Sequence, residues 1–378
     1  MRQKINYEKL IKGYYEAERM PKGFSSEETV PGYAYNILNS TGLLYRPVID
    51  ELHLKSGGKK PIWPDGKKFA VCLTHDVDTV SLYSSKQSLR KLRYRLSQSK
   101  TPSDVLRRPI GFGIEIINII KNEAKRDPFH CYERWLEAEK NVGARSTFFF
   151  WPGYSSIKRH HYSDCFYELY DPVVFDNENC SVSEMIQEID RRGWEIGLHP
   201  SWYSFDDIDE VKRQKDALEK TVGHDVNSIR QHYLHYDIRR TPKIHAMAGF
   251  KYDSTLGFND NIGFRFGTCY PWHLFELESE QELSVLEIPL CIQDVSMLSP
   301  SRGMRLDEDM AFEYIVLLAE SVAHVGGVLT LLWHPSRIID KFYWSLYLKT
   351  LNYLKGENPW FATTQMIGEY WETYCLKS

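Results

Sequence analysis

Short apolar runs alternate with amphipathic segments along most of the chain, and this alternation constrains the fold more than any other feature. The runs are brief and rich in β-branched and aromatic residues, which is typical of buried parallel strands. They lie at 69–74, 146–151, 194–198, 228–232, 285–290 and 328–333. Strands that alternate with helices predict an α/β fold, in which helices wrap a parallel sheet or barrel.

The segments between these runs carry helix signals. Ser181-Val-Ser-Glu184 is a capping box, and Gly193 lies just past the end of the apolar stripe that follows it. A long apolar stretch over 307–325 ends at Gly326-Gly327, and 366–374 carries a final amphipathic stripe. Each of these stretches is predicted to be a helix.

The size of the chain allows one large domain or one domain with an appendage. Its 378 residues are 42% hydrophobic, which supplies a full core and excludes a chain that is disordered throughout. A turn-rich stretch at 56–68 separates a region of mixed sequence pattern from one in which short apolar runs alternate with helical segments. We therefore predict an N-terminal extension at 1–67 and an α/β domain at 68–378.

Charge and cysteine content exclude several classes of protein. The 47 basic and 51 acidic residues give a net charge of −4, which disfavours a nucleic-acid binder. The seven cysteines include no close pair, so a disulfide framework is not expected. The first residues contain no apolar signal-peptide core, and no apolar run is long enough to span a membrane. A soluble, cytoplasmic protein is the expectation.

A basic stretch at about 83–126 interrupts the alternation after the first strand. Leu89, Leu92 and Leu96 fit one helical face, which predicts a helical insertion. Two interpretations remain open: a solvated crossover helix, or a surface that meets an acidic glycan, a diphosphate carrier or a membrane face. The basic residues are Lys86, Arg90, Lys91, Arg93, Arg95, Lys100, Arg107 and Arg108.

Two carboxylates mark the end of the first strand. Asp76 and Asp78 are two residues apart, so on an extended chain their side chains point to the same face. Carboxylates held that close repel each other unless a cation or a proton lies between them. The pair therefore suits one metal ligand and one neighbouring base.

Three later strands end on histidine. His199 follows the 194–198 run, His334 follows the 328–333 run, and Arg230 and His232 share a face at the end of the fourth run. Reactive groups in α/β folds cluster at such strand ends. Imidazole and carboxylate ligands together favour Zn²⁺ or a similar divalent ion.

These motifs resemble, in order, those of the polysaccharide deacetylases, also called NodB-homology or carbohydrate esterase family 4 domains. The resemblance runs from about 69 to 371. It is carried by 74–78, by His199-Pro-Ser-Trp-Tyr203, by Arg230, by Tyr252-Asp-Ser-Thr255 and by Leu331-Leu-Trp-His334. It implies that 68–378 form a distorted (β/α) barrel.

The resemblance also implies a reaction and a role for each matched residue. Asp76 corresponds to the catalytic base and Asp78 and His199 to metal ligands, while Arg230 orients the base and His334 is the general acid. The implied function is metal-dependent removal of an N-acetyl group from an amino sugar or glycan precursor, with Zn²⁺ as the expected ion.

The sequence departs from the family pattern at Tyr203, where a second histidine ligand is usual. A phenol with a pKa of about 10 is a poor ligand at neutral pH. His232 is our preferred replacement. A site without a third protein ligand is the alternative, and His75, or the loop residues His160 and His161, are less favoured.

Other functions are also open. Loss of the second histidine would suit a metal-poor relative that binds glycan without hydrolysing it, and the same fold could serve a hydrolase of cyclic amides or formamides. The aromatic stretch 267–273, together with Arg265 and Trp202, is a further candidate for the wall of a sugar site.

Overall fold

The computed structural model describes residues 5–19, 35–97, 127–153 and 160–375, with positions 113, 117, 119 and 121. Lys100, Arg107 and Arg108 of the basic insertion lie outside the described residues. Within the described part of the chain, no helix is long and apolar enough to cross a membrane.

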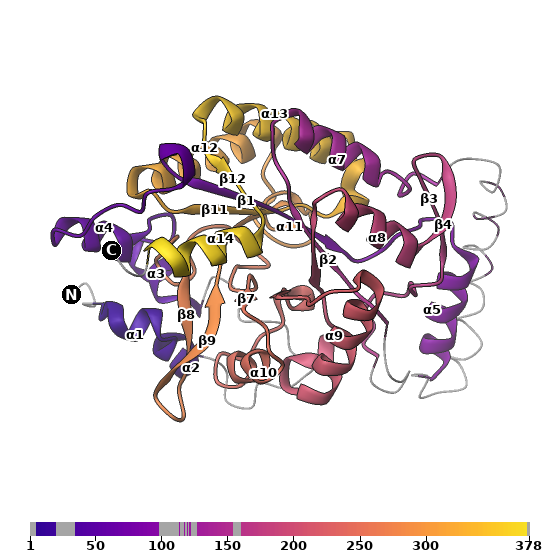
Figure 1. The fold of residues 1–378 in the computed structure, drawn as a ribbon, viewed down its shortest axis with the longest axis horizontal. Helices are drawn as coiled ribbons and strands as arrows, with labels where there is room; N and C mark the ends of the chain where they lie inside the picture. Colours follow the sequence, from indigo (N-terminus) through magenta and orange to yellow (C-terminus); the bar gives the residue numbers. More distant parts are fainter. Residues whose placement is uncertain are drawn as a thin grey trace.

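A curled, mostly parallel sheet forms the centre of the molecule (Figure 1). Its strand order is β10-β11-β1-β2-β5-β6-β7-β9-β8, and β12 also pairs with β1. The strands are β1 (Ala70–Val77), β2 (Thr147–Phe150), β5 (Glu195–Leu198), β6 (Ser228–Ile229), β7 (Tyr252–Asp253), β8 (Trp272–Glu276), β9 (Gln281–Glu287), β10 (Leu290–Gln293), β11 (Val328–Leu332) and β12 (Trp360–Phe361). This open half-barrel confirms the predicted α/β fold class.

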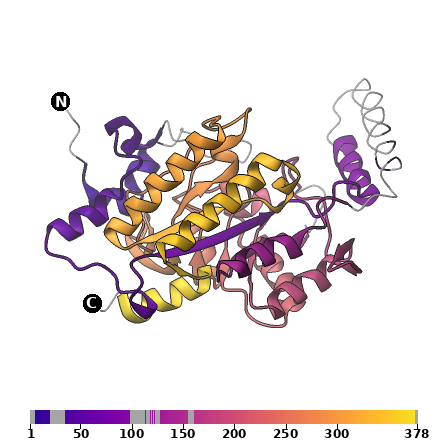
Figure 2. The same ribbon diagram turned by 90° about the horizontal axis from the view of Figure 1, so that it is seen from above.

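Helices cover the outside of the curled sheet. The longer ones are α5 (Ser85–Ser97), α7 (Tyr132–Asn141), α8 (Val182–Arg191), α9 (Ile208–Val222), α12 (Glu308–Val325) and α13 (Lys341–Glu357). The shorter ones are α1 (Tyr7–Ile11), α2 (Tyr14–Arg19), α3 (Ile37–Thr41), α4 (Val48–Lys55), α10 (Thr241–Met247), α11 (Asp294–Leu298) and α14 (Thr364–Tyr370). Helices α12 and α13 pack against each other, and α12 packs against β11 (Figure 2).

The predicted helix ends are present. Ser181 and Glu184 form the reciprocal capping box of α8. Asp307 caps α12, which ends at Gly326 with a left-handed backbone, φ 81°. A short antiparallel hairpin of β3 (Pro172–Phe175) and β4 (Glu178–Ser181) leads into α8 and was not predicted.

Two predicted strands differ from the observed ones, and one observed strand at the edge of the sheet, β8, was not predicted. The run at 285–290 is divided between β9 and β10, because Pro289 has no backbone N–H to give to a sheet. The 228–232 run is extended only as far as Ile229, and His232 opens a 3-10 turn. Strand β8 pairs antiparallel with β9, so one edge of the sheet departs from the parallel pattern.

Strand β1 is buried along its whole length, and its two faces differ in chemistry. On one face, His75 Nε2 donates to the Glu139 carboxylate at 2.6 Å, and His75 Nδ1 lies 2.7 Å from the carbonyl oxygen of Trp333. Glu139 also accepts hydrogen bonds from Trp194 and Tyr347. His75 therefore belongs to a buried polar network in the core, on the side away from Asp76.

Helix α5 of the basic insertion lies apart from the sheet (Figure 2). Its Arg90 binds the Asp171 carboxylate through both terminal nitrogens and lies 3.8 Å from Glu168. This arginine is neutralised by the protein itself and is not available to an acidic partner.

The described N-terminal residues pack against the segment that follows β7. Ile49 donates a hydrogen bond to the Gly267 carbonyl, and Glu16 forms an ion pair with Arg265. Asp50, on α4, accepts hydrogen bonds from the Thr268 hydroxyl at 2.5 Å and from the Cys269 backbone N–H at 2.7 Å. Arg265 is thus buried and paired with Glu16, and its place in a sugar site stays a prediction.

Asp50 is expected to make folding pH-dependent. Burial raises its pKa to about 6, although the bonds from Thr268 and Cys269 lower it. The protonated carboxyl contributes fully to the free energy of unfolding below about pH 4, the pKa of an aspartate in the unfolded chain. This contribution is lost as pH rises through about 6, the pKa in the folded protein. A shift of about two pKa units corresponds to about 3 kcal/mol. Urea unfolding from pH 4 to 7 should show that Asp50→Asn lacks this decline, and parallel curves for the two proteins would contradict the assignment.

Candidate active site

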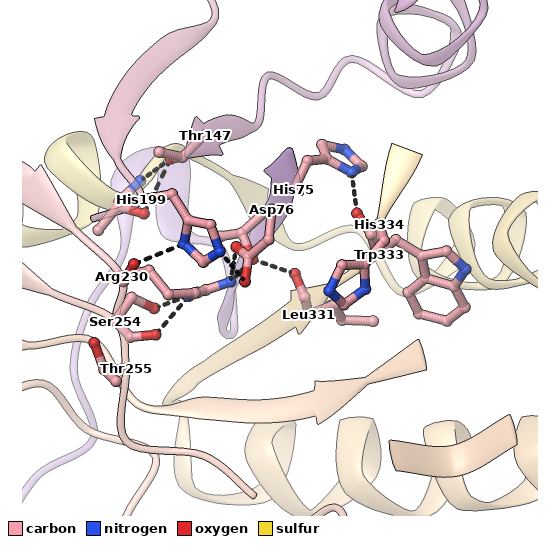
Figure 3. A network of polar contacts seen from close by, with 12 residues as sticks. His75, Asp76, Thr147, His199, Arg230, Ser254, Thr255, Leu331, Trp333 and His334 are labelled. Carbon is pink, nitrogen blue, oxygen red and sulfur yellow. Dashed lines mark hydrogen bonds and ion pairs between the residues drawn. The ribbon is translucent and has the colours of Figure 1, made fainter. Parts of the chain in front are cut away.

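The residues singled out at strand ends meet at one edge of the sheet, and Figure 3 shows four of them, Asp76, His199, Arg230 and His334. Asp76 and Asp78 come from the end of β1, His199 follows β5, and His334 follows β11. Because these strands are parallel, their carboxyl ends share one edge. Arg230 and His232, which follow β6, complete the group of six.

Three side chains converge on one point. The Asp78 Oδ1 atom lies 3.3 Å from His199 Nε2 and 3.5 Å from His232 Nδ1. The two ring nitrogens are 2.9 Å apart. His232 therefore lies where the sequence hypothesis placed it, beside the first two proposed ligands.

The hydrogen bonds of the two imidazoles determine which ring nitrogens carry protons. His199 Nδ1 lies 2.7 Å from the Arg230 carbonyl, and His232 Nε2 lies 2.6 Å from the Ser163 carbonyl. A carbonyl oxygen only accepts, so both of these nitrogens must donate. In the neutral rings, the nitrogens that face each other and Asp78 then carry lone pairs.

This arrangement fits a bound cation. Two nitrogen lone pairs and a carboxylate oxygen repel one another unless positive charge lies between them. Asp78 Oδ1 is also buried without a hydrogen-bond partner among the described residues. Two imidazoles and one carboxylate are a donor set that suits Zn²⁺ or a similar divalent ion, with positions left for water or substrate.

The ionisation of Asp78 and His232 suits metal binding, whereas His199 would give up a proton to a bound ion. Burial lowers the pKa of His199, but the carboxylates of Asp76 and Asp78 raise it by more, so it lies above its usual value. Burial lowers the pKa of His232 to about 4, so its ring is neutral at pH 7. Burial raises the pKa of Asp78, but the nearby rings of His199, His334 and His232 lower it by more, and it falls well below its usual range. Asp78 is therefore ionised. A neutral imidazole and an ionised carboxylate are the forms that ligate metals.

Cys165 lies beside this cluster, and sequence reasoning missed it. Its sulfur and ligand atoms of Asp78 and His232 all lie within 4.8 Å of one another. Burial raises the pKa of the thiol well above its usual value, and the thiol donates to the Val77 carbonyl at 3.8 Å. No motif surrounds this residue, so only the fold reveals its position.

Arg230 is fully buried and fixed from several sides. Its Nη1 donates to Thr74 Oγ1 at 2.6 Å and lies 3.4 Å from Asp76 Oδ1. Ser254 accepts from Nε through its carbonyl and from Nη2 through its hydroxyl. The guanidinium also lies over the Phe149 ring, 4.7 Å from its centroid. A rigid cation thus holds the Asp76 carboxylate in one orientation.

His334 is held by a buried aspartate that the motifs do not include. Its Nδ1 lies 2.7 Å from Asp294 Oδ1, and its backbone N–H donates to Asp294 Oδ2 at 2.9 Å. Burial lowers the pKa of His334, but Asp294 outweighs this effect and raises it to about 9. The ring is protonated at neutral pH, and its Nε2 lies 3.7 Å from Asp78 Oδ2. Asp294 is the first residue of α11.

A pocket of about 630 Å³ opens onto Asp76, Asp78, His199 and His334. Its other lining residues are Tyr233, Leu234, Asn259, Gln293, Val295, Arg302, Ser336 and Arg337. The 267–273 stretch and Trp202 are not among the lining residues, so the hypothesis that they form its wall is wrong. Trp202 is buried and stacks on His161 and His235, with centroid distances of 4.2 and 4.1 Å.

The residues around Tyr203 form an aromatic cluster. Tyr203 lies in the 3-10 turn Trp202–Asp206, with its ring 5.6 Å from that of His161. His161 and His160 are both buried, and His160 Nδ1 lies 3.8 Å from Asp164 Oδ2. Tyr203 therefore packs against His161, while His232 lies 3.5 Å from Asp78.

Comparison with known proteins identifies the fold. No family model matches the sequence, and no curated protein matches it. The structure resembles that of a polysaccharide deacetylase from Mycobacterium smegmatis, with a TM-score of 0.53 and 20% identity over 83% of this chain and 93% of that one. It also resembles Puue allantoinase, with a TM-score of 0.50 and 16% identity over 83% and 93% of the two chains. The chain therefore has the curled (β/α) half-barrel of the NodB-type polysaccharide deacetylases.

Proposed function

We propose that this protein is a metal-dependent hydrolase that removes an N-acetyl group from an amino sugar or glycan precursor. The observation that carries the proposal is the pair of imidazole nitrogens of His199 and His232 that face the ionised Asp78. A carboxylate held by an arginine and a protonated histidine lie beside them. Metal-assisted hydrolysis of an amide uses these three kinds of group together: ligands for the ion, a general base and a general acid.

Asp78, His199 and His232 are the proposed metal ligands, and Cys165 is close enough to act as a further one. A divalent ion, with Zn²⁺ favoured by the donor set, supplies a bound water of lowered pKa and polarises the acetyl carbonyl. Asp78 provides the negative charge of the site, and the Arg230 and Ser163 carbonyls keep the two rings in the ligating tautomer.

Asp76 and His334 are the proposed base and acid. Asp76 takes the proton from the attacking water, since Arg230 fixes its carboxylate toward the pocket. His334 donates a proton from Nε2 to the departing amine, and Asp294 both orients the ring and keeps it charged. The products are acetate and a free amino sugar, and no serine or cysteine nucleophile is required.

A second candidate is hydrolysis of a different non-peptide C–N bond, such as that of a cyclic amide. The allantoinase with a similar fold favours this alternative. Acetate release from N-acetylglucosamine compounds, compared with ring opening of allantoin under the same conditions, separates the two reactions.

Metal content tests the proposal first. Elemental analysis after reconstitution should find about one divalent ion per wild-type chain, and His232→Ala should bind it about a hundredfold more weakly in a chelator competition, because a ligand nitrogen is lost. The matched variant His235→Ala removes another buried histidine of the same turn, and it should keep the metal.

Cys165→Ser refines the ligand set. Weaker metal binding in this variant would make the thiol a ligand, and unchanged binding would leave Asp78, His199 and His232 as the ligand set.

A wild-type protein that takes up no divalent ion would overturn the catalytic proposal and favour a glycan-binding relative.

A further inference from the structure

Two arginines line the candidate pocket and have no role in the proposed hydrolysis. Arg302 and Arg337 reach the same pocket as Asp76, Asp78 and His334. They come from distant parts of the chain, the segment before α12 and the 3-10 turn after β11.

Both guanidinium groups are supported by aromatic rings. Arg302 lies 4.6 Å from the centroid of the Tyr233 ring, and Arg337 lies 5.4 Å from that of Tyr343. Tyr233 itself lines the pocket. A ring beneath a guanidinium stabilises its charge and limits the conformations of the side chain, while the N–H edge stays free to bind.

Neither arginine has a carboxylate partner in the described part of the chain. No Asp or Glu oxygen of the described residues lies within 4.0 Å of either guanidinium. By contrast, the buried or half-buried Arg90, Arg213 and Arg265 each pair with an acidic side chain. Arg302 and Arg337 are both exposed, so their charges face the open pocket without an ion pair to a described carboxylate.

The two carboxylates of the pocket do not cancel this charge. Asp76 is paired with Arg230, and Asp78 faces the rings of His199, His232 and His334. The chain as a whole carries a net charge of −4, so the local positive charge is not a general property of the protein. A pocket of this kind attracts anions and raises their local concentration.

We infer that the substrate carries an anionic group, a phosphate or a carboxylate, that binds Arg302 and Arg337 while its acetamide faces Asp76 and Asp78. This inference rests on the proposed deacetylase function and narrows its substrate to a charged N-acetyl sugar. Guanidinium groups bind both anions through paired, charge-assisted hydrogen bonds.

Paired substrates test the inference. N-acetylglucosamine 1-phosphate should have a lower KM than N-acetylglucosamine, and N-acetylmuramic acid distinguishes a carboxylate from a phosphate as the preferred anion. Arg302→Gln or Arg337→Gln should raise the KM of the preferred charged substrate about tenfold, and the double variant about a hundredfold, as expected for the loss of one or two charge-assisted contacts. Arg305→Gln, a nearby exposed arginine that does not line the pocket, should leave KM unchanged.

A binding measurement separates this inference from the proposed function. Calorimetric titration of the chelator-treated protein with inorganic pyrophosphate should show binding that the double variant loses. If pyrophosphate binds through the two arginines but no sugar releases acetate, the anion site stands and the deacetylase proposal fails. If neutral and charged sugars are hydrolysed with equal KM in the wild type, or the double variant keeps the wild-type preference, the anion site is wrong and the deacetylase stands.

Discussion

Asp78→Asn is expected to abolish metal binding and to lower the rate of acetate release about a thousandfold or more. The substitution keeps the shape of the side chain but removes the carboxylate charge that lies closest to His199 and also faces His232. Substitution of residues that only hydrogen-bond to metal ligands already lowers metal affinity or activity about 10- to 100-fold. Loss of a charged ligand itself is expected to lower them more. Elemental analysis and a chelator competition measure the loss of metal directly.

The control for this variant is Asp216→Asn, an exposed aspartate on α9 that should leave metal content and rate unchanged. Burial raises the pKa of Asp78, but the surrounding rings lower it by more, so its charge contributes to stability. Circular dichroism therefore has to show that Asp78→Asn is folded before its metal content is interpreted. Full metal occupancy in Asp78→Asn would show that this carboxylate is not a ligand and would move the site elsewhere.

Asp76→Asn is expected to lower kcat about a thousandfold while the protein keeps its metal. General-base catalysis by a positioned side chain contributes about 10²- to 10⁴-fold, and an amide cannot take the proton of the attacking water. Arg230 retains its bonds to Thr74 and Ser254, so the guanidinium should stay in place without the carboxylate. Steady-state kinetics and metal analysis on the same preparation give both quantities.

The contrast between the two aspartates is the sharper result. Asp78→Asn should lose metal and activity together, whereas Asp76→Asn should lose activity alone. A rate within tenfold of wild type for Asp76→Asn would rule out this carboxylate as the base. Loss of metal from Asp76→Asn would instead make it a ligand.

Much of the fold could be predicted from the sequence, because its signals are local. Buried parallel strands are continuous apolar runs, and the first run predicted β1 close to its observed limits. The capping box at Ser181 and the aspartate at 307 each mark a helix start within a few residues. The antiparallel strand β8 was missed because it begins in an aromatic stretch that was interpreted as a loop. Its strand conformation depends on pairing with β9, which lies in the next segment of the chain.

The expectation that reactive groups cluster at the carboxyl ends of parallel strands also led to the candidate site. Parallel strands bring these ends to one edge of the sheet, however far apart the strands lie in the sequence. This expectation placed His232 beside His199 although the strand before it is only two residues long. It could not find Asp294 or Cys165. Asp294 reaches His334 from across 40 residues of chain, and Cys165 follows a segment with no periodic pattern. Contacts of this kind arise from tertiary packing, which no local pattern encodes.

The two faces of β1 bear on how the protein can be used. His75 and Asp76 are consecutive, yet one belongs to a core network with Glu139 and the other to the pocket. A change at Asp76 should therefore halt turnover without unfolding the chain, and such a variant would retain a bound sugar long enough to be captured. Mass spectrometry of compounds that co-purify with Asp76→Asn, and not with Asp76→Asn combined with the two arginine substitutions, would turn the inactive protein into a reagent for identifying its own substrate.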